Sequence, residues 1–128
     1  MSGLDGVGAE LAKEKSMEGK SDPTATSVWA AFRDKGHVEL VEEMQPLARP
    51  VGARFCERMT SKHDVYAVVC EFADEESAQK GAKAAANARF KNREVLERRS
   101  ATCAIHRTSD SAEAVAEAKR MKEVFLSL

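Results

Sequence analysis

The amino-acid sequence predicts an α+β fold, and three observations support this prediction. The first is a hairpin pattern, in which two strand-like segments flank the polar residues SKHD (61–64). The second is the junction CEFADEESA (70–78), where an apolar strand gives way directly to an acidic, alanine-rich helix start. The third is the alternation of strand-like and helix-like segments along the chain, which is typical of helices packed on a sheet.

Length and charge fit one domain with no strong electrostatic preference. The chain has 128 residues, which is enough for a single hydrophobic core. Its 20 basic and 21 acidic side chains give a net charge of -1, so charge favours neither nucleic acid nor an anionic membrane as a partner. No apolar run approaches the ~18 residues of a membrane-spanning helix, and MSGLDGVGAELAKEK lacks the apolar segment of a secretory signal. We therefore expect a cytoplasmic protein that binds neither nucleic acid nor membranes.

The cysteine pattern predicts reduced thiols. Cys56, Cys70 and Cys103 are an odd number without a C-x-x-C spacing, which argues against a disulfide framework. A thiolate cluster that binds a metal would need histidine or acidic partners at ligand spacing, and the sequence shows none. We therefore expect three small buried side chains, no metal site and no cofactor.

The expected domain covers residues 24–128 and follows an arm of residues 1–23. The arm is rich in glycine and mixed charge, which indicates a flexible segment. The helical spacing of Leu4, Val7 and Leu11 leaves a short docking helix open as the alternative.

Two elements are expected between the arm and the hairpin. The segment TATSVWAAFR (24–33) is rich in β-branched and aromatic residues and favours a strand, with a helix as the alternative. The segment HVELVEEMQPLARP (37–50) places its apolar residues on one helix face, and Pro46 and Pro50 end that helix.

The remaining elements run from the hairpin to a final helix. GARFCERMT (52–60) alternates between two faces, and VYAVVCEF (65–72) is apolar on both, so its strand should be covered on both sides. A helix is expected from an N-cap at Asp74 to about Phe90. The second half of EVLERRSATCAIHRT (94–108) predicts a strand, and the spacing of Asp110 and Glu113 predicts the cap of a closing helix.

The first six elements have the order βαββαβ, which is that of a ferredoxin-like sandwich with an extra C-terminal helix. In such a sandwich two helices cover one face of a four-stranded sheet. The other face is apolar and uncovered, so a partner chain is expected to bury it.

At this point the chain resembles the antibiotic-biosynthesis-monooxygenase-like family of dimeric α+β barrels. The likeness covers roughly Thr24 to Thr108. It is carried by Lys35-Gly36 with the acidic helix ending in MQPLARP, the Gly52-led strand, the turn at His63-Asp64, and CEFADEESA. The resemblance implies a homodimer whose sheets pack face to face and enclose a cavity in each subunit. The arm and the final helix depart from the family pattern.

The resemblance also implies a function. Members of the family oxygenate phenolic compounds without metal or flavin, degrade haem or isomerise small carbonyl compounds, and others have no known reaction. The catalytic asparagine of the oxygenases has no matching position, because Asn87 and Asn92 fall at a helix end. We therefore expect a protein that binds a small hydrophobic or aromatic compound, with cofactor-independent monooxygenation as the activity to test. The alternative is a non-catalytic docking or assembly subunit of a larger complex.

Four side chains, one on each expected strand, are the candidate site residues. Trp29 and Tyr66 would bind the substrate, while Arg54 as an anion-binding fork and His106 as a base would be catalytic. In the alternative interpretation the two aromatic residues fill the core or an interface, Arg54 forms a surface ion pair, and His106 lies in solvent. Glu71 would be a general base if buried, although such a carboxylate more commonly pairs with an arginine of the adjoining strand.

Overall fold

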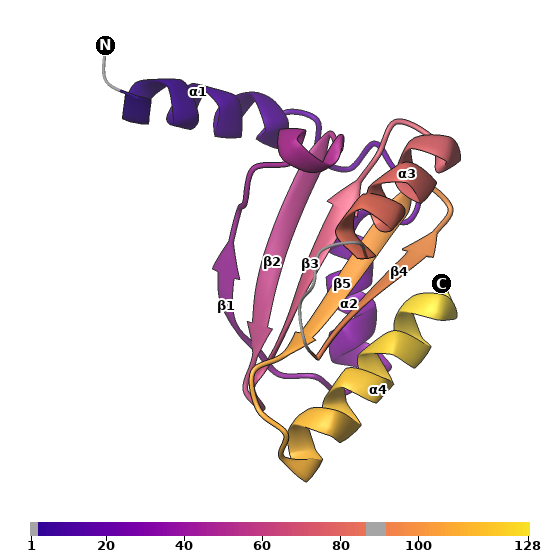
Figure 1. Cartoon of the computed structure of the whole chain (residues 1–128). Helices are drawn as coiled ribbons and strands as arrows, with labels where there is room; N and C mark the ends of the chain where they lie inside the picture. The colour runs from indigo at the N-terminus through magenta and orange to yellow at the C-terminus, as the bar shows by residue number, and fades with distance from the viewer. Residues whose placement is uncertain (1–2, 87–91) are drawn as a thin grey trace.

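A five-stranded antiparallel sheet with helices on both faces is the frame of the structure, a computed structural model that describes residues 3–86 and 92–128 (Figure 1). The helices are α1 (Gly3–Lys15), α2 (Ala25–Asp34), α3 (Glu75–Ala86) and α4 (Ala112–Leu126). The strands are β1 (Leu40–Met44), β2 (Phe55–Ser61), β3 (Val65–Glu71), β4 (Arg93–Arg98) and β5 (Ala101–Arg107). They lie in the order β1-β2-β3-β5-β4, and a 3-10 turn, η1 (Arg49–Val51), connects β1 to β2.

The two faces of the sheet differ in what covers them. α2 and α4 pack on one face, the helix face, where Phe32, Phe125 and Met121 are fully buried in the main core. α3 and η1 pack on part of the opposite face, the groove face, around a smaller cluster that includes Phe72 and Ala78. The rest of the groove face carries no helix of the described chain, and this asymmetry positions the candidate site.

The predicted hairpin is confirmed. β2 and β3 pair antiparallel, with Glu57 opposite Val69 and Thr60 opposite Tyr66. The predicted alternation within β2 also holds, because Phe55 lies in the main core while the next residue lies in the smaller cluster. The hairpin register therefore fixes which side chains of these strands reach the groove face.

The strand expected over residues 24–33 is wrong, because this segment forms α2. The side chain of Thr24 accepts a hydrogen bond from the Ser27 backbone N–H at 3.1 Å, which is an N-cap. Val28 and Phe32 are fully buried and lie one helical turn apart, against α4. The β-branched content favoured a strand, but the cap and this tertiary packing outweigh a propensity of a few tenths of a kcal/mol per residue.

The helix expected over residues 37–50 is also wrong, because Leu40–Met44 is the edge strand β1. The short run LVEEM fits both the helical period of 3.6 residues and the strand period of two, and its pairing with β2 makes it a strand.

Strand β4 was not among the expected strands, because its polar and apolar residues alternate only weakly. The order βαββαβ is therefore not the order seen in residues 3–86 and 92–128. The α+β class is confirmed, and the sheet with its helices is compatible with a ferredoxin-like fold.

Both predicted helices that follow the hairpin are confirmed. The Asp74 side chain accepts a hydrogen bond from the Ser77 N–H at 2.7 Å, and this bond holds the pKa of Asp74 below its usual value. The N-cap of α4 is Ser111 and not the expected Asp110, since the Ser111 hydroxyl accepts from the Ala114 N–H at 3.1 Å. The expected extension of α3 to Phe90 lies outside the described residues.

α3 lies close to the sheet because a glycine faces it. A Cβ atom added at Gly81 would stand 2.4 Å from Cζ of Phe72 and 3.3 Å from the carbonyl oxygen of Val51. Any larger residue at this position would push the helix away from the smaller cluster. Gly81 therefore determines how tightly α3 closes one end of the groove face.

The segment expected to be a flexible arm is, over its described residues, a helix followed by an anchored linker. α1 lies beside η1 (Figure 1), and the buried Glu14 carboxylate accepts hydrogen bonds from the N–H groups of Ala48 and Arg49 at 2.7 and 3.0 Å. These bonds satisfy the first amide groups of η1 and attach α1 to the sheet edge.

The linker before α2 is held by Glu71. This side chain is fully buried, and its two oxygens accept hydrogen bonds from the N–H groups of Gly19 and Ala25, both at 2.8 Å. Since Ala25 is the first residue of α2, one carboxylate joins the linker, the helix start and the end of β3.

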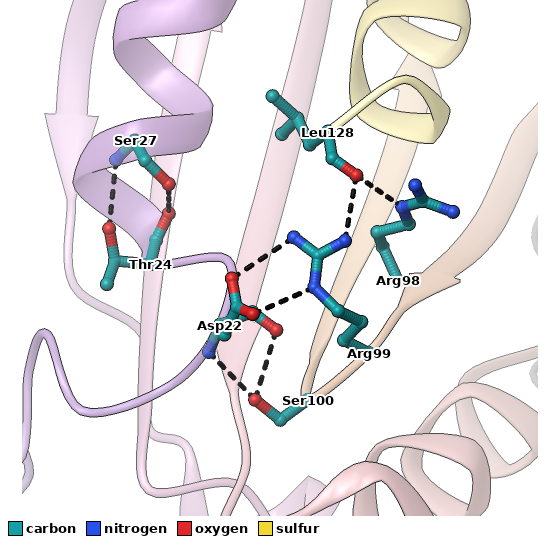
Figure 2. A network of polar contacts seen from close by, with 7 residues as sticks. All are labelled: Asp22, Thr24, Ser27, Arg98, Arg99, Ser100 and Leu128. Atoms are coloured by element: carbon teal, nitrogen blue, oxygen red, sulfur yellow. Dashed lines mark hydrogen bonds and ion pairs between the residues drawn. The ribbon is translucent and has the colours of Figure 1, made fainter.

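A second polar network holds the same linker to the turn between β4 and β5 (Figure 2). Arg99 pairs with Asp22 through Nε and Oδ2 at 2.9 Å, and the Asp22 N–H donates to the Ser100 hydroxyl oxygen at 2.8 Å. The Leu128 carbonyl oxygen accepts hydrogen bonds from Arg98 and Arg99. The linker, the turn and the end of α4 are therefore joined at one place.

We predict that Glu71→Gln destabilises the fold by roughly 1–3 kcal/mol, because the amide nitrogen cannot accept and one buried N–H loses its partner. The free energy of unfolding can be measured by urea denaturation, followed through the single tryptophan. Glu123→Gln, at an exposed position of α4, is the control and should change it by less than about 0.5 kcal/mol. Equal stability of the two variants would contradict this role of Glu71.

Candidate functional site

A hollow of about 250 Å³ on the groove face is the candidate site. Residues of η1, α3 and all the strands named above line it. Its charged lining residues are Arg58 and Arg93, and none of the described lining residues is acidic. The hollow is therefore an apolar surface with positive charge, in a chain whose net charge is close to zero.

The strand register arranges side chains of the groove face in three rows across the sheet. The polar row consists of Thr60, Tyr66, His106 and Arg93. The middle row consists of Arg58, Val68, Ala104 and Val95. The sulfur row begins with Cys56, Cys70 and Thr102. Successive rows are two residues apart, which is about 7 Å along the strands.

A stack of side chains forms the polar end of the hollow. The guanidinium carbon of Arg58 lies 3.9 Å from the centre of the Tyr66 ring, and the Tyr66 and His106 rings are stacked with their centres 4.8 Å apart. Arg58 forms no ion pair with any described residue, so its contact with the tyrosine leaves its charge uncompensated. This end of the hollow is suited to a negatively charged group.

His106 is neutral near pH 7. Partial burial, followed by the charges of Arg93 and Arg58, holds the pKa of His106 below its usual value. Its Nδ1 atom is buried and has no hydrogen-bond partner among the described residues. A neutral imidazole adds a polar group at this end of the hollow and no positive charge.

A disulfide borders the apolar end. The expectation of three reduced thiols is wrong for Cys56 and Cys70, whose sulfurs are bonded and whose Cα atoms lie 4.1 Å apart. Their spacing of 14 residues shows no pairing signal, because only the register of β2 and β3 places them opposite each other. Cys103 is a free thiol on the helix face, as predicted, and burial raises its pKa.

The structure brings together two of the four predicted site residues. Tyr66 and His106 meet on the groove face, whereas Trp29 is 2% exposed in the main core and belongs to α2. Arg54 precedes β2 and lines a separate hollow beside α1. Glu71 is buried as the base hypothesis requires, but its oxygens accept backbone hydrogen bonds.

Arg58 and Arg93 line the site but were not among the predicted site residues. Arg58 lies on the same strand face as Cys56, and the predicted alternation of faces along residues 52–60 already indicates this position. Arg93 had no such signal, because β4 was not expected. Both lie where a charge meets an apolar surface, which is common at ligand sites.

Trp29 has a structural partner. Its indole N–H donates to the Glu57 carboxylate on β2, and Glu57 is 5% exposed. Burial is the main cause that raises the pKa of Glu57, the neighbouring Glu43 adds to it, and the bond from Trp29 opposes it. The folded protein therefore holds the Glu57 proton more tightly than the unfolded chain does.

We predict that Glu57 makes stability fall as pH rises from the ordinary glutamate pKa through the raised one, because the native state binds more protons in this window. Urea denaturation from about pH 4 to about pH 7 would measure the free energy of unfolding. Glu57→Gln, which still accepts from Trp29 but does not ionise, should lack this part of the slope, and Glu123→Gln should keep it. Parallel curves for the wild type and Glu57→Gln would refute the assignment.

Comparisons with known proteins do not identify the chain. No protein-family model matches it, and neither curated proteins nor solved structures give a significant match. The resemblance to dimeric α+β barrels therefore stays a hypothesis. Within residues 3–86 and 92–128, every helix is too short or too polar to cross a bilayer.

Proposed function

We propose that the groove face binds a small organic anion with an apolar or aromatic body. The proposal rests on one observation: the hollow is positively charged toward one end and apolar at the other. Arg58 lies toward one end, where it forms no ion pair with any described residue, and Phe72 with the disulfide lies at the other. The distance from the polar row to the sulfur row is about 13 Å along the strands, which sets the length of the ligand.

Each part of such a ligand has a matching surface. A carboxylate or sulfonate accepts charge-assisted hydrogen bonds from guanidinium groups, which are stronger than bonds between neutral groups. The body of the ligand covers the middle row, where Val68, Ala104 and Val95 expose carbon. A hollow of about 250 Å³ is smaller than the ~300–1,000 Å³ of sites for drug-sized ligands, which favours a small molecule.

Cofactor-independent monooxygenation of a small aromatic compound is a narrower form of this proposal. A neutral His106 stacked on Tyr66 is suited to accept a proton from a bound phenol, which is the first requirement of such an activity. Dioxygen uptake in the presence of a phenol that binds the groove would support the oxygenase hypothesis. Binding without uptake would limit the protein to a binding function.

Homodimer formation through the groove face is a second proposal, supported by its partly exposed apolar residues Met44 and Leu47. Two copies packed across this face would bring their Arg58 and Arg93 side chains toward each other, and a bound anion would reduce the repulsion. Sedimentation with and without an aromatic anion separates the cases, since an anion-dependent dimer is expected. A dimer that forms equally without the anion would favour the docking or assembly alternative.

We predict that Arg58→Gln weakens binding of the aromatic anion 1-anilinonaphthalene-8-sulfonate roughly tenfold, because it removes a charge-assisted hydrogen bond. Fluorescence titration measures the dissociation constant. N-phenyl-1-naphthylamine has the same aromatic body without the sulfonate, and its affinity should change little. Arg33→Gln removes an exposed arginine of α2, away from the hollow, and is the matched control.

Equal losses for the charged and the neutral probe would show that Arg58 acts on packing and not on charge. Unchanged binding of the sulfonate to Arg58→Gln, with saturable binding to the wild type, would place the anion elsewhere and remove the proposal.

A further inference from the structure

The disulfide between Cys56 and Cys70 lies at the wall of the same hollow that carries the arginines. We propose that small thiols with a negative charge enter the groove and exchange with this disulfide. The inference rests on the proposed binding of anions. It assigns a reaction, thiol–disulfide exchange, and a substrate class, anionic low-molecular-weight thiols, to the groove.

Access to the sulfurs favours one direction of attack. Both cysteines line the hollow, and Cys70 is 6% exposed whereas Cys56 is 1% exposed. Phe72 and Gly81 close the end of the hollow behind the sulfur row, where no space remains for a Cβ atom. A thiol therefore reaches the sulfurs from the open part of the hollow. Displacement of Cys56 in line with the S–S bond brings it to Cys70 from the side opposite Cys56, beside Thr102 of β5.

The charge of the groove selects among thiols. Arg58 lies one row from the sulfurs, and the described lining residues contain no carboxylate that would repel an anion. A surface of one sign raises the local concentration of ions of the opposite sign and so raises the rate of encounter. The thiolate is the attacking species, so the same field favours the reactive form.

The exchange balances as two successive displacements. A thiolate RS⁻ attacks Sγ of Cys70, an RS–Sγ bond forms, the Cys56–Cys70 bond breaks, and Cys56 leaves as a thiolate. A second RS⁻ attacks the RS sulfur of the mixed disulfide, which releases RSSR and the Cys70 thiolate. The two cysteine thiolates take up the two protons that the two RSH molecules lost. The thiols are oxidised to RSSR, the protein disulfide is reduced to a dithiol, and the reverse reaction uses RSSR as oxidant.

The remaining cysteine does not take part in this chemistry. Cys103 is fully buried on the helix face, and burial raises its pKa, so it is neither accessible nor ionised near neutral pH. Among the described residues the exchanging pair is therefore Cys56 and Cys70, which makes the number of newly exposed thiols a clean readout.

The test compares three thiols of similar size on the folded protein: anionic 3-mercaptopropionate, neutral 2-mercaptoethanol and cationic cysteamine. Alkylation of released thiols followed by mass spectrometry gives the rate of reduction. Each rate is divided by the rate of the same thiol with bis(2-hydroxyethyl) disulfide, because thiols differ in intrinsic nucleophilicity. We expect a normalised preference of roughly tenfold for the anion at low salt, which decreases as salt is added.

Variants of Arg58 test whether this residue causes the preference for the anionic thiol. Arg58→Gln should abolish most of the preference, Arg58→Lys should retain it because the charge remains, and Arg33→Gln should behave as the wild type. Equal normalised rates for the three thiols would overturn the proposal. So would reduction at a rate independent of thiol concentration, because that result means the disulfide reacts only after the chain unfolds.

Titration with 1-anilinonaphthalene-8-sulfonate on the same variants separates the two proposals. Binding that depends on Arg58, without a preference for the anionic thiol, rejects the exchange and leaves anion binding in place. The absence of both results rejects both proposals.

Discussion

The backbone register of β3 with β2 and β5 is the constraint on which the rest of the structure depends. It places Cys70 opposite Cys56 and Tyr66 opposite His106, on the face that the helices leave partly open. A shift of one residue would turn every one of these side chains into the main core. The same register puts Val65, Ala67 and Val69 under α2 and α4, so burial of these residues holds the groove face in its present form.

Buried carboxylates explain how a nearly neutral chain acquires a cationic groove. Glu14 and Glu71 accept backbone hydrogen bonds, Glu57 accepts from an indole, and Glu117 accepts from the Ser61 hydroxyl. Each of these carboxylates lies at a sheet edge, on the helix face or under the linker, and each stabilises a junction between elements. The acids are thus used as structural acceptors, whereas Arg58 on the groove face is left without an acidic partner in the described chain.

This distribution links stability to function. Arg58 is half-buried and forms no ion pair with a described residue, so its charge contributes little to the stability of the fold. The same charge is suited to bind a ligand of opposite sign. The stacked Tyr66 and His106 hold Arg58 in place without neutralising it. The Cys56–Cys70 disulfide lies at the apolar end of the hollow, where the far end of a bound anion would lie. One hollow therefore combines a guanidinium group that recognises an anion with a disulfide that can exchange with a thiol.

The sequence by itself determined the α+β class, the hairpin of β2 and β3 with its alternating faces, and the two helices α3 and α4, although it placed the cap of α4 one residue early, at Asp110. Each of these features depends on local signals such as caps and period-two patterns. It did not determine α2, β1 or β4, since short segments such as LVEEM fit more than one period and only packing selects between them. The tertiary structure alone decided that Tyr66 meets His106 while Trp29 turns into the core, and that two cysteines face each other. These outcomes depend on strand register across the sheet, which is a property of long-range pairing and leaves no mark in local sequence.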